Sequence, residues 1–280
     1  MSSEVGREHP ALGGVYAKLE RAEVHLRSFE EAFRIWVEEH ADDFAVAVEW
    51  PTSRLTVTHP PPDMATANTW SAIAGDCVHN ARSALDHLAC QLVIANGKDP
   101  GTSTRFPLED DPPRCSDCGA TGQARVAGAH PAANTVVDAA QPYRQDWRYE
   151  RMQSLRQMDD VDKHRALPVL TGYFQTLLWG HDPADPPSKV PLTMGSWADG
   201  EATLTCGWPH EMSGEVQFYL SFGDRERNAQ ARVVPFLRVL LDQEIGPLVA
   251  ALAEFVVNPP PSQNSARWKK THRCAESGSA

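Results

Sequence analysis

Long apolar runs are missing from this sequence of 280 residues. Crossing a bilayer takes about 20 consecutive apolar residues, and no stretch approaches that length, so we expect no membrane-spanning helix. The N-terminal residues also lack the apolar segment of a secretion signal. Cysteine is scarce, with 6 residues scattered along the chain, which excludes a disulfide scaffold. These absences together predict a cytoplasmic protein.

Positive charge is in deficit, because 26 Lys and Arg residues face 37 Asp and Glu residues, a net charge of -11. This balance argues against a chain that coats nucleic acid or an anionic membrane over its whole surface, although a local basic patch stays open. Three catalytic or nucleotide-binding signatures are also absent: GxSxG, the Walker motif and a Gly-rich phosphate loop. The sequence therefore does not place the chain among the enzymes that these motifs define.

Apolar residues do recur at helical spacing in three long segments, at about residues 11–40, 63–96 and 229–257. Asn96-Gly97 is a typical end for the second helix, and Pro247 should kink the third. Shorter helices are predicted at about residues 131–140 and 145–160. The helices alone would form a bundle.

Alternating apolar residues predict strands between these helices. Residues 44–50 and 55–59 have the pattern of a β-hairpin, and further strands are expected at 167–178, 202–208 and 215–222. Helices separated by antiparallel-type strands favour the α+β class. We therefore predict an α+β fold, a long-helix bundle packed with a small antiparallel β-sheet, as a single domain over residues 1–257. The tail, residues 258–280, is Pro- and Ser-rich and then basic, and should be disordered.

The second long helix has no Glu or Lys between Met64 and Gln91. Solvated helix faces are usually filled with Glu, Lys and Gln, so short polar groups among alanines indicate packing against other elements. Two polar strips run beside the apolar face. One holds His79, Arg82 and Asp86, and the other holds Asp76, Asn80, Ser83 and His87. Buried polar groups must be paired, so the strips form either a network that ties helices together or a catalytic or ligand site.

A second polar cluster spans residues 159–165, where six of seven side chains are ionisable. It is either a solvated helix end, with cations well placed at the C-terminus, or part of the same site. In the second case Asp162 and His164 face the helix of residues 63–96. We then expect His79, Arg82, Asp86 and His164 to meet in space.

The stretch from Arg82 to His87 resembles the Arg-x4-His signature of the HEPN (higher eukaryotes and prokaryotes nucleotide-binding) domains. These are helical bundles, and many are metal-independent ribonucleases. The wider string from His79 to Leu88, with Asp162-Lys163-His164-Arg165 later in the chain, also resembles uncharacterised bacterial proteins. That second resemblance covers most of the chain and implies no activity.

The HEPN resemblance implies roles for individual side chains. His87 would transfer protons at the ribose 2′-hydroxyl or the leaving oxygen, a role suited to a group that titrates near neutrality. Arg82 would hold the phosphate and stabilise charge in the transition state. Asn80 and Asp86 would orient these groups. Two subunits would pair their motifs as a homodimer.

Arginines alternate with aromatic residues upstream of the second cluster. Arg144, Arg148 and Arg151 share one face of the predicted helix, beside Tyr143 and nearby aromatics. Together with Arg165 they are candidates for gripping phosphates while the aromatic rings stack bases of RNA or a nucleotide. The alternative is a set of surface arginines paired with neighbouring carboxylates.

A metal site is a further hypothesis, and no other cofactor is expected. Cys115 and Cys118 have the spacing of half a zinc knuckle, to which Cys206 and His210 could add the other half. A metal-binding helical protein, with the ion held by residues such as His79, Asp86 and His164, is a further alternative.

Two main classes of function stay open. The first is a HEPN-like enzyme, a metal-independent ribonuclease or a nucleotide-binding protein that uses Arg82 and His87. The second is a non-catalytic binding or regulatory protein in which the same polar cluster is structural.

Overall fold

The computed structural model describes residues 7–49, 54–58, 62–111, 123–144, 147–164, 169–180, 190–194, 201–205, 212–222 and 232–261. The chain divides into two compact units. The first comprises Met1–Glu23, Cys77–Asp160 and Arg238–Ala280, and the second comprises Val24–Asp76 and Val161–Leu237. The predicted single domain over residues 1–257 stays a prediction, because three long helices contribute residues to both units.

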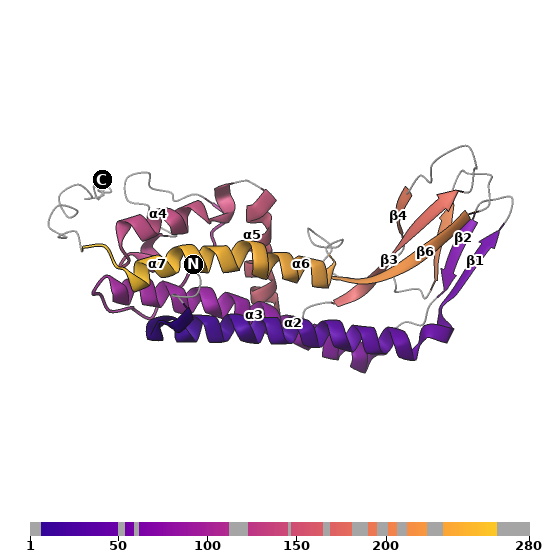
Figure 1. Ribbon diagram of the computed structural model, residues 1–280, viewed down its shortest axis with the longest axis horizontal. Coiled ribbons are helices and arrows are strands. Elements are labelled where there is room, and N and C mark those ends of the chain that lie inside the picture. The colour runs from indigo at the N-terminus through magenta and orange to yellow at the C-terminus, as the bar shows by residue number, and fades with distance from the viewer. Residues whose placement is uncertain are drawn as a thin grey trace, which may run out of the picture. The chain divides into compact units, whose positions relative to one another are not determined.

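Helices make up most of the described secondary structure (Figure 1). The α-helices are α2 (Gly13–Glu39), α3 (Met64–Ala95), α4 (Pro131–Ala139), α5 (Trp147–His164), α6 (Val233–Val239) and α7 (Gly246–Val257). Short 3-10 turns are η1 (Pro10–Leu12), η2 (Ala41–Asp43), η3 (Gln123–Val126) and η4 (Pro142–Arg144). The two long helices predicted near residues 11–40 and 63–96 correspond to α2 and α3.

Local capping sets both ends of α3. At its start the carboxylate of Asp63 accepts a hydrogen bond from the Thr66 amide at 2.7 Å, which satisfies a backbone donor that the helix leaves free. At its end Gly97 has φ 70, a left-handed conformation that glycine adopts without steric cost. The Lys98 amide then bonds back to the Val93 carbonyl at 3.2 Å. These caps explain why the sequence defined this helix well.

The C-terminal helix is interrupted by the π-helix η6 (Leu240–Ile245), whereas the kink expected at Pro247 stays a prediction. The Gly246 amide bonds to the Leu241 carbonyl, five residues back, so the turn is wider than an α-helical turn. Pro247 follows in the first turn of α7, where it has no amide hydrogen to donate. Wide turns of this kind are a known cause of bends in helices.

The strands in the described ranges form two antiparallel sheets of three strands each (Figure 1). One has the order β1-β2-β5, from β1 (Ala45–Glu49), β2 (Arg54–Thr58) and β5 (Glu201–Thr205). The other has the order β4-β3-β6, from β4 (Val190–Met194), β3 (Val169–Gly180) and β6 (Met212–Phe222). All six strands belong to the second unit.

The predicted α+β fold, with a long-helix bundle packed with one small antiparallel β-sheet, is wrong. The described part of the chain is mostly helical, and most hydrophobic residues whose burial is described lie on helices and their connections. Leu220 and Phe222, at the end of β6, are buried as well. Alternation along a strand predicts the strand itself, but it does not say whether its apolar face covers a helix.

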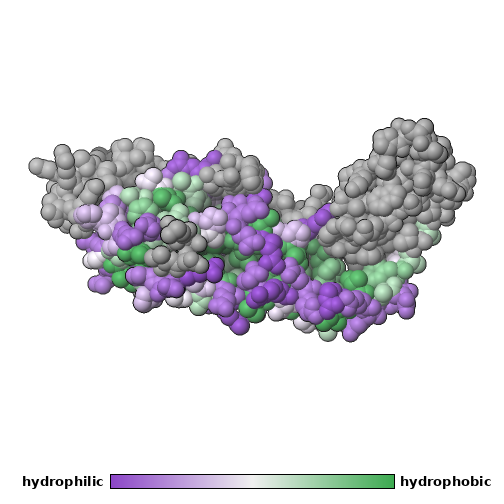
Figure 2. Space-filling view, in the orientation of Figure 1, coloured by the Kyte–Doolittle hydropathy of each residue, from purple (hydrophilic) through white to green (hydrophobic). Residues whose placement is uncertain are grey.

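Within the described ranges, no helix is long and apolar enough to cross a bilayer. Figure 2 shows hydrophilic side chains over much of the surface along α2, with smaller hydrophobic areas between them.

Aromatic rings form the core of the second unit where α2 and α3 meet. The Trp70 ring lies edge-on to Phe33 and Trp36, with centroid distances of 5.8 Å and 5.5 Å. Trp36 makes a similar contact with Phe44, which precedes β1. Trp70 is only 2% exposed, so this cluster excludes water from the interface of the two helices.

Replacing Trp70 with Ala should therefore lower the free energy of unfolding by about 3–5 kcal/mol, because it leaves a cavity among the aromatic rings. Urea denaturation followed by circular dichroism measures this change. Met64→Ala on the same helix is the control, since Met64 is 71% exposed and its truncation should change stability by no more than about 0.5 kcal/mol. Equal effects of the two substitutions would contradict the aromatic core.

Candidate functional site

Arg82 is buried in the first unit, with 7% of its surface exposed. Its Nη2 donates a hydrogen bond to the main-chain carbonyl of Phe106 at 2.7 Å. The same nitrogen lies 3.0 Å from Oδ1 of Asp86, one turn further along α3. Arg82 therefore joins its own helix to a segment 24 residues away in the sequence.

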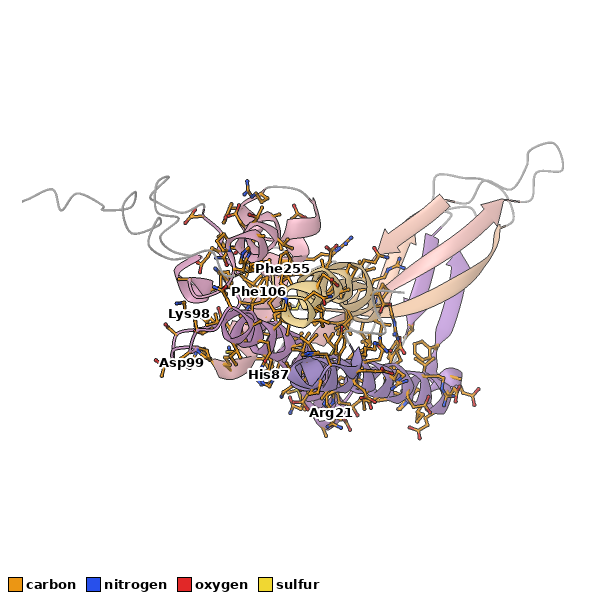
Figure 3. The ribbon with its side chains drawn as sticks, turned by 60° about the vertical axis from the view of Figure 1, so that its left-hand side comes forward. Arg21, His87, Lys98, Asp99, Phe106 and Phe255 are labelled. Atoms are coloured by element: carbon orange, nitrogen blue, oxygen red, sulfur yellow. The ribbon has the colours of Figure 1, made fainter. Side chains whose placement is uncertain are left out.

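Asp86 completes a closed arrangement with the same residue. Its Oδ1 accepts the main-chain N–H of Phe106 at 2.9 Å. Arg82 and Asp86 thus bind both backbone polar groups of Phe106, one as donor and the other as acceptor. The Phe106 side chain is fully buried, and Figure 3 shows it among the helices of this unit. The pair therefore fixes the backbone of Phe106 next to α3.

Residues 104–110, here called the strap, carry more contacts of this kind. Arg156 of α5 donates to the Leu108 carbonyl at 3.0 Å. The Glu109 amide donates to the side-chain oxygen of Gln141 at 3.1 Å. The strap has no regular secondary structure, so its backbone groups need partners from outside. These partners are side chains of α3, of α5 and of Gln141, which follows α4.

His79 meets a carboxylate of α5. Its Nδ1 lies 3.3 Å from Oδ1 of Asp159. The His79 side chain is 50% exposed, whereas that of Asp159 is 3% exposed. A buried carboxylate thus faces one ring nitrogen of a half-exposed imidazole, an arrangement that fixes the orientation of the ring.

Electrostatics link Asp159 to Arg82 as well. Burial lowers the pKa of the Arg82 guanidinium, while the charges of Asp86 and Asp159 raise it. Because arginine stays protonated in proteins, the practical meaning is that the two carboxylates compensate a buried positive charge. Arg105 and Arg125 lie near enough to oppose them. The site is therefore a network of charged side chains in which α3 contacts α5 and the strap.

The second polar strip of α3 faces α2. Lys18 donates to Oδ1 of Asn80 at 3.3 Å. His87 is exposed, and a Cβ added to Gly14 would lie 3.0 Å from its Nδ1. Figure 3 places His87 on the side of α3 next to α2. His87 and Asn80 therefore lie over α2, away from the strap.

Arg82 and His87 do not converge. They are five positions apart, which at about 100° per residue turns their side chains about 140° apart on one helix. The structure pairs Arg82 with Phe106 and Asp86, and it packs His87 against Gly14. The site combines three predicted positions in two pairs of contacts: Arg82 with Asp86, and His79 with Asp159, which the sequence analysis did not name as a site residue.

The expected approach of His164 to His79 and Arg82 stays a prediction. His164 is exposed, is the last residue of α5 and belongs to the second unit, whereas His79 belongs to the first. The residue of α5 that approaches His79 is Asp159, one and a half turns earlier. Within the second unit, Asp162 packs against Gly75 of α3, where an added Cβ would lie 2.0 Å from Oδ1.

The predicted arginine face is divided between two elements. Arg144 lies in η4 and pairs with Asp138, while Arg151 lies in α5, 2.6 Å from Glu244. The side chain of Arg148 and the whole of Arg165 lie outside the described residues. Arg144 and Arg151 therefore match the alternative of paired surface arginines, because each already has a carboxylate partner.

The four predicted zinc ligands, Cys115, Cys118, Cys206 and His210, also lie outside the described residues. In the part of the chain that is described, no three His, Cys, Asp or Glu side chains cluster closely enough to hold a metal ion. His79, Asp86 and His164 therefore do not form such a group there.

Zinc can be tested directly. If the four residues are ligands, protein purified without chelator should contain close to one zinc per chain, measured by plasma mass spectrometry. X-ray absorption should then show Zn–S distances of about 2.3 Å. A zinc content that is unchanged in Cys115→Ser would contradict the proposed ligand set.

Comparison with protein families, with curated proteins and with solved structures gave no match for this chain. The interpretation therefore depends on the residues and their geometry.

Sequence reasoning missed Phe106, Gln141 and Arg156 altogether. Phe106 and Leu108 stand in a segment without periodicity. One signal could have found it: the run Phe106-Pro107-Leu108 is apolar inside an otherwise polar stretch, as is typical of a segment that packs on a core. Nothing in the sequence pairs that run with α3.

Asp159 should matter for stability more than its neighbours do. Asp159→Asn keeps the shape but removes the negative charge that faces Arg82 and His79, so the free energy of unfolding should fall by about 1–3 kcal/mol. Asp160→Asn is the matched control, because Asp160 is exposed on the same helix; it should change stability by about 0.5 kcal/mol or less. Thermal and urea unfolding measure both, and a control as destabilising as Asp159→Asn would count against the network.

Proposed function

We propose that this chain is a non-catalytic binding or regulatory protein in which the polar residues of α3 hold the strap in place. One observation carries the proposal: Arg82, 7% exposed, is hydrogen-bonded to the Phe106 carbonyl and paired with Asp86, which itself binds the Phe106 amide. A guanidinium that grips a substrate phosphate needs an accessible face. Nη2 of Arg82 is instead engaged within the fold, by the Phe106 carbonyl and Asp86.

The position of His87 supports the same conclusion. The HEPN mechanism requires the arginine and the histidine to act on one phosphodiester, with reacting groups within hydrogen-bond reach. His87 packs against Gly14 of α2, about 140° around the helix from the Arg82 direction.

The cytoplasm is the compartment that best fits a chain with few cysteines and no described membrane helix.

A second candidate is an RNA-cleaving enzyme, HEPN-like and metal-independent, in which His79 transfers protons. The contact of its Nδ1 with buried Asp159 favours this alternative, because a carboxylate that orients an imidazole leaves the other ring nitrogen available for acid–base chemistry. RNA or a nucleotide would then be the ligand, and a homodimer the expected assembly.

Parallel measurements of RNA cleavage and melting separate the two candidates. Under the main proposal, wild-type protein cleaves none of a diverse set of RNAs. Arg82→Ala should then melt several degrees lower, because it removes the donor to the Phe106 carbonyl and the cation beside Asp86, at a cost of about 1–3 kcal/mol. Arg21→Ala, exposed on α2, is the matched control and should melt like wild type.

The enzyme predicts the opposite pattern. Wild-type protein would cleave RNA in the presence of chelator, and His79→Ala or His87→Ala would lower the rate by about 10²-fold or more with an unchanged melting temperature. Such a result would replace the proposed function with the second candidate.

A further inference from the structure

The strap is held by the rest of the first unit as a protein holds a bound peptide. Side chains from outside the strap pair with both backbone groups of Phe106, with the carbonyl of Leu108 and with the amide of Glu109. The apolar side chains of Phe106 and Leu108 are 0% and 1% exposed, and Pro107 between them is buried. Backbone bonds combined with buried apolar side chains are the usual means of recognising an extended peptide.

The flanking acidic residues of the strap add charge recognition. Glu109 lies 3.1 Å from Nη1 of Arg125. Asp110 pairs with Arg156 and accepts a hydrogen bond from Gln153 at 2.9 Å. The surface under the strap, here called the strap site, therefore matches an aromatic–Pro–aliphatic core followed by two acidic residues.

The strap does not use every donor of the strap site. Two buried nitrogen atoms, Nη1 of Arg82 and Nε of Arg156, have no hydrogen-bond partner among the described residues. Both belong to arginines that already bond to strap carbonyls. Buried donors of this kind are rare and costly, so a ligand with further acceptors could bind more favourably than the strap does.

We propose that the strap site is a peptide-binding site whose external ligand is an extended peptide of a partner protein. In the free chain the strap occupies this site and competes with that peptide. Its chemistry is an aromatic–Pro–aliphatic core with two acidic residues on the C-terminal side. This inference rests on the proposed function, since it names the ligand class of a non-catalytic binding protein. Because the strap is tethered, its effective concentration is about millimolar, and external peptide binds mainly when the strap is released.

The test uses the full-length chain with a weakened strap, Phe106→Ala combined with Leu108→Ala. The probe is a fluorescein-labelled peptide with the sequence of residues 103–111, STRFPLEDD, and binding is measured by fluorescence anisotropy. The strap variant should bind this peptide at least about tenfold more tightly than wild type, because the tethered competitor is lost. Saturating peptide should also raise the melting temperature of the variant.

A matched peptide with both apolar residues replaced by alanine is the control and should not bind. The proposal is overturned if the strap variant is helical by circular dichroism but binds no peptide, or if wild type binds as tightly as the variant. Should the double variant not fold, Phe106→Leu takes its place, with about a threefold gain expected and the same contrary outcomes.

The two proposals fail separately. Absence of peptide binding, together with no RNA cleavage and early melting of Arg82→Ala, would remove the peptide site and leave the non-catalytic function. RNA cleavage by wild type would remove that function whatever the peptide does.

Discussion

The first unit depends on the burial of one guanidinium. Arg82 cannot lose its charge, so its burial is tolerated only where carboxylates and carbonyls surround it. Asp86 supplies one carboxylate from the same helix, Asp159 supplies another from α5, and Phe106 supplies a carbonyl from the strap. Each of these elements is thereby required to lie next to α3. A single side chain thus explains why an irregular segment and a second helix have defined places on α3.

The histidines of α3 show how one helix can present similar groups to different surroundings. His79 faces a buried carboxylate, and His87 faces a glycine of α2. A resemblance that depends on two residue types at a fixed spacing cannot distinguish these cases. In this chain the arginine of the Arg-x4-His pattern bonds to Phe106 and Asp86, whereas Nδ1 of His79 lies 3.3 Å from the buried carboxylate of Asp159. The distinction between scaffold and enzyme depends on exposure rather than on motif.

Local chemistry made the helices predictable. Asp63 before α3 and Gly97 after it are capping residues, and their effects act within one turn of the chain. The strands were different, since the predicted packing of one small sheet with the helices was wrong. Alternation describes the two faces of a strand but not the element that covers them, and the helices bury their apolar stripes largely in a helical core.

For the site, the residue types alone indicate that α3 carries arginine, aspartate and histidine where solvated helices carry glutamate and lysine, and hence that these groups need partners. The identity of those partners follows from the way the helices and the strap pack. Phe106 lies 24 residues from Arg82, and Asp159 lies 80 residues from His79. No periodicity spans such separations, because contacts between distant segments depend on how whole helices pack. The requirement for pairing is a property of each residue, whereas the pairing itself is a property of the fold.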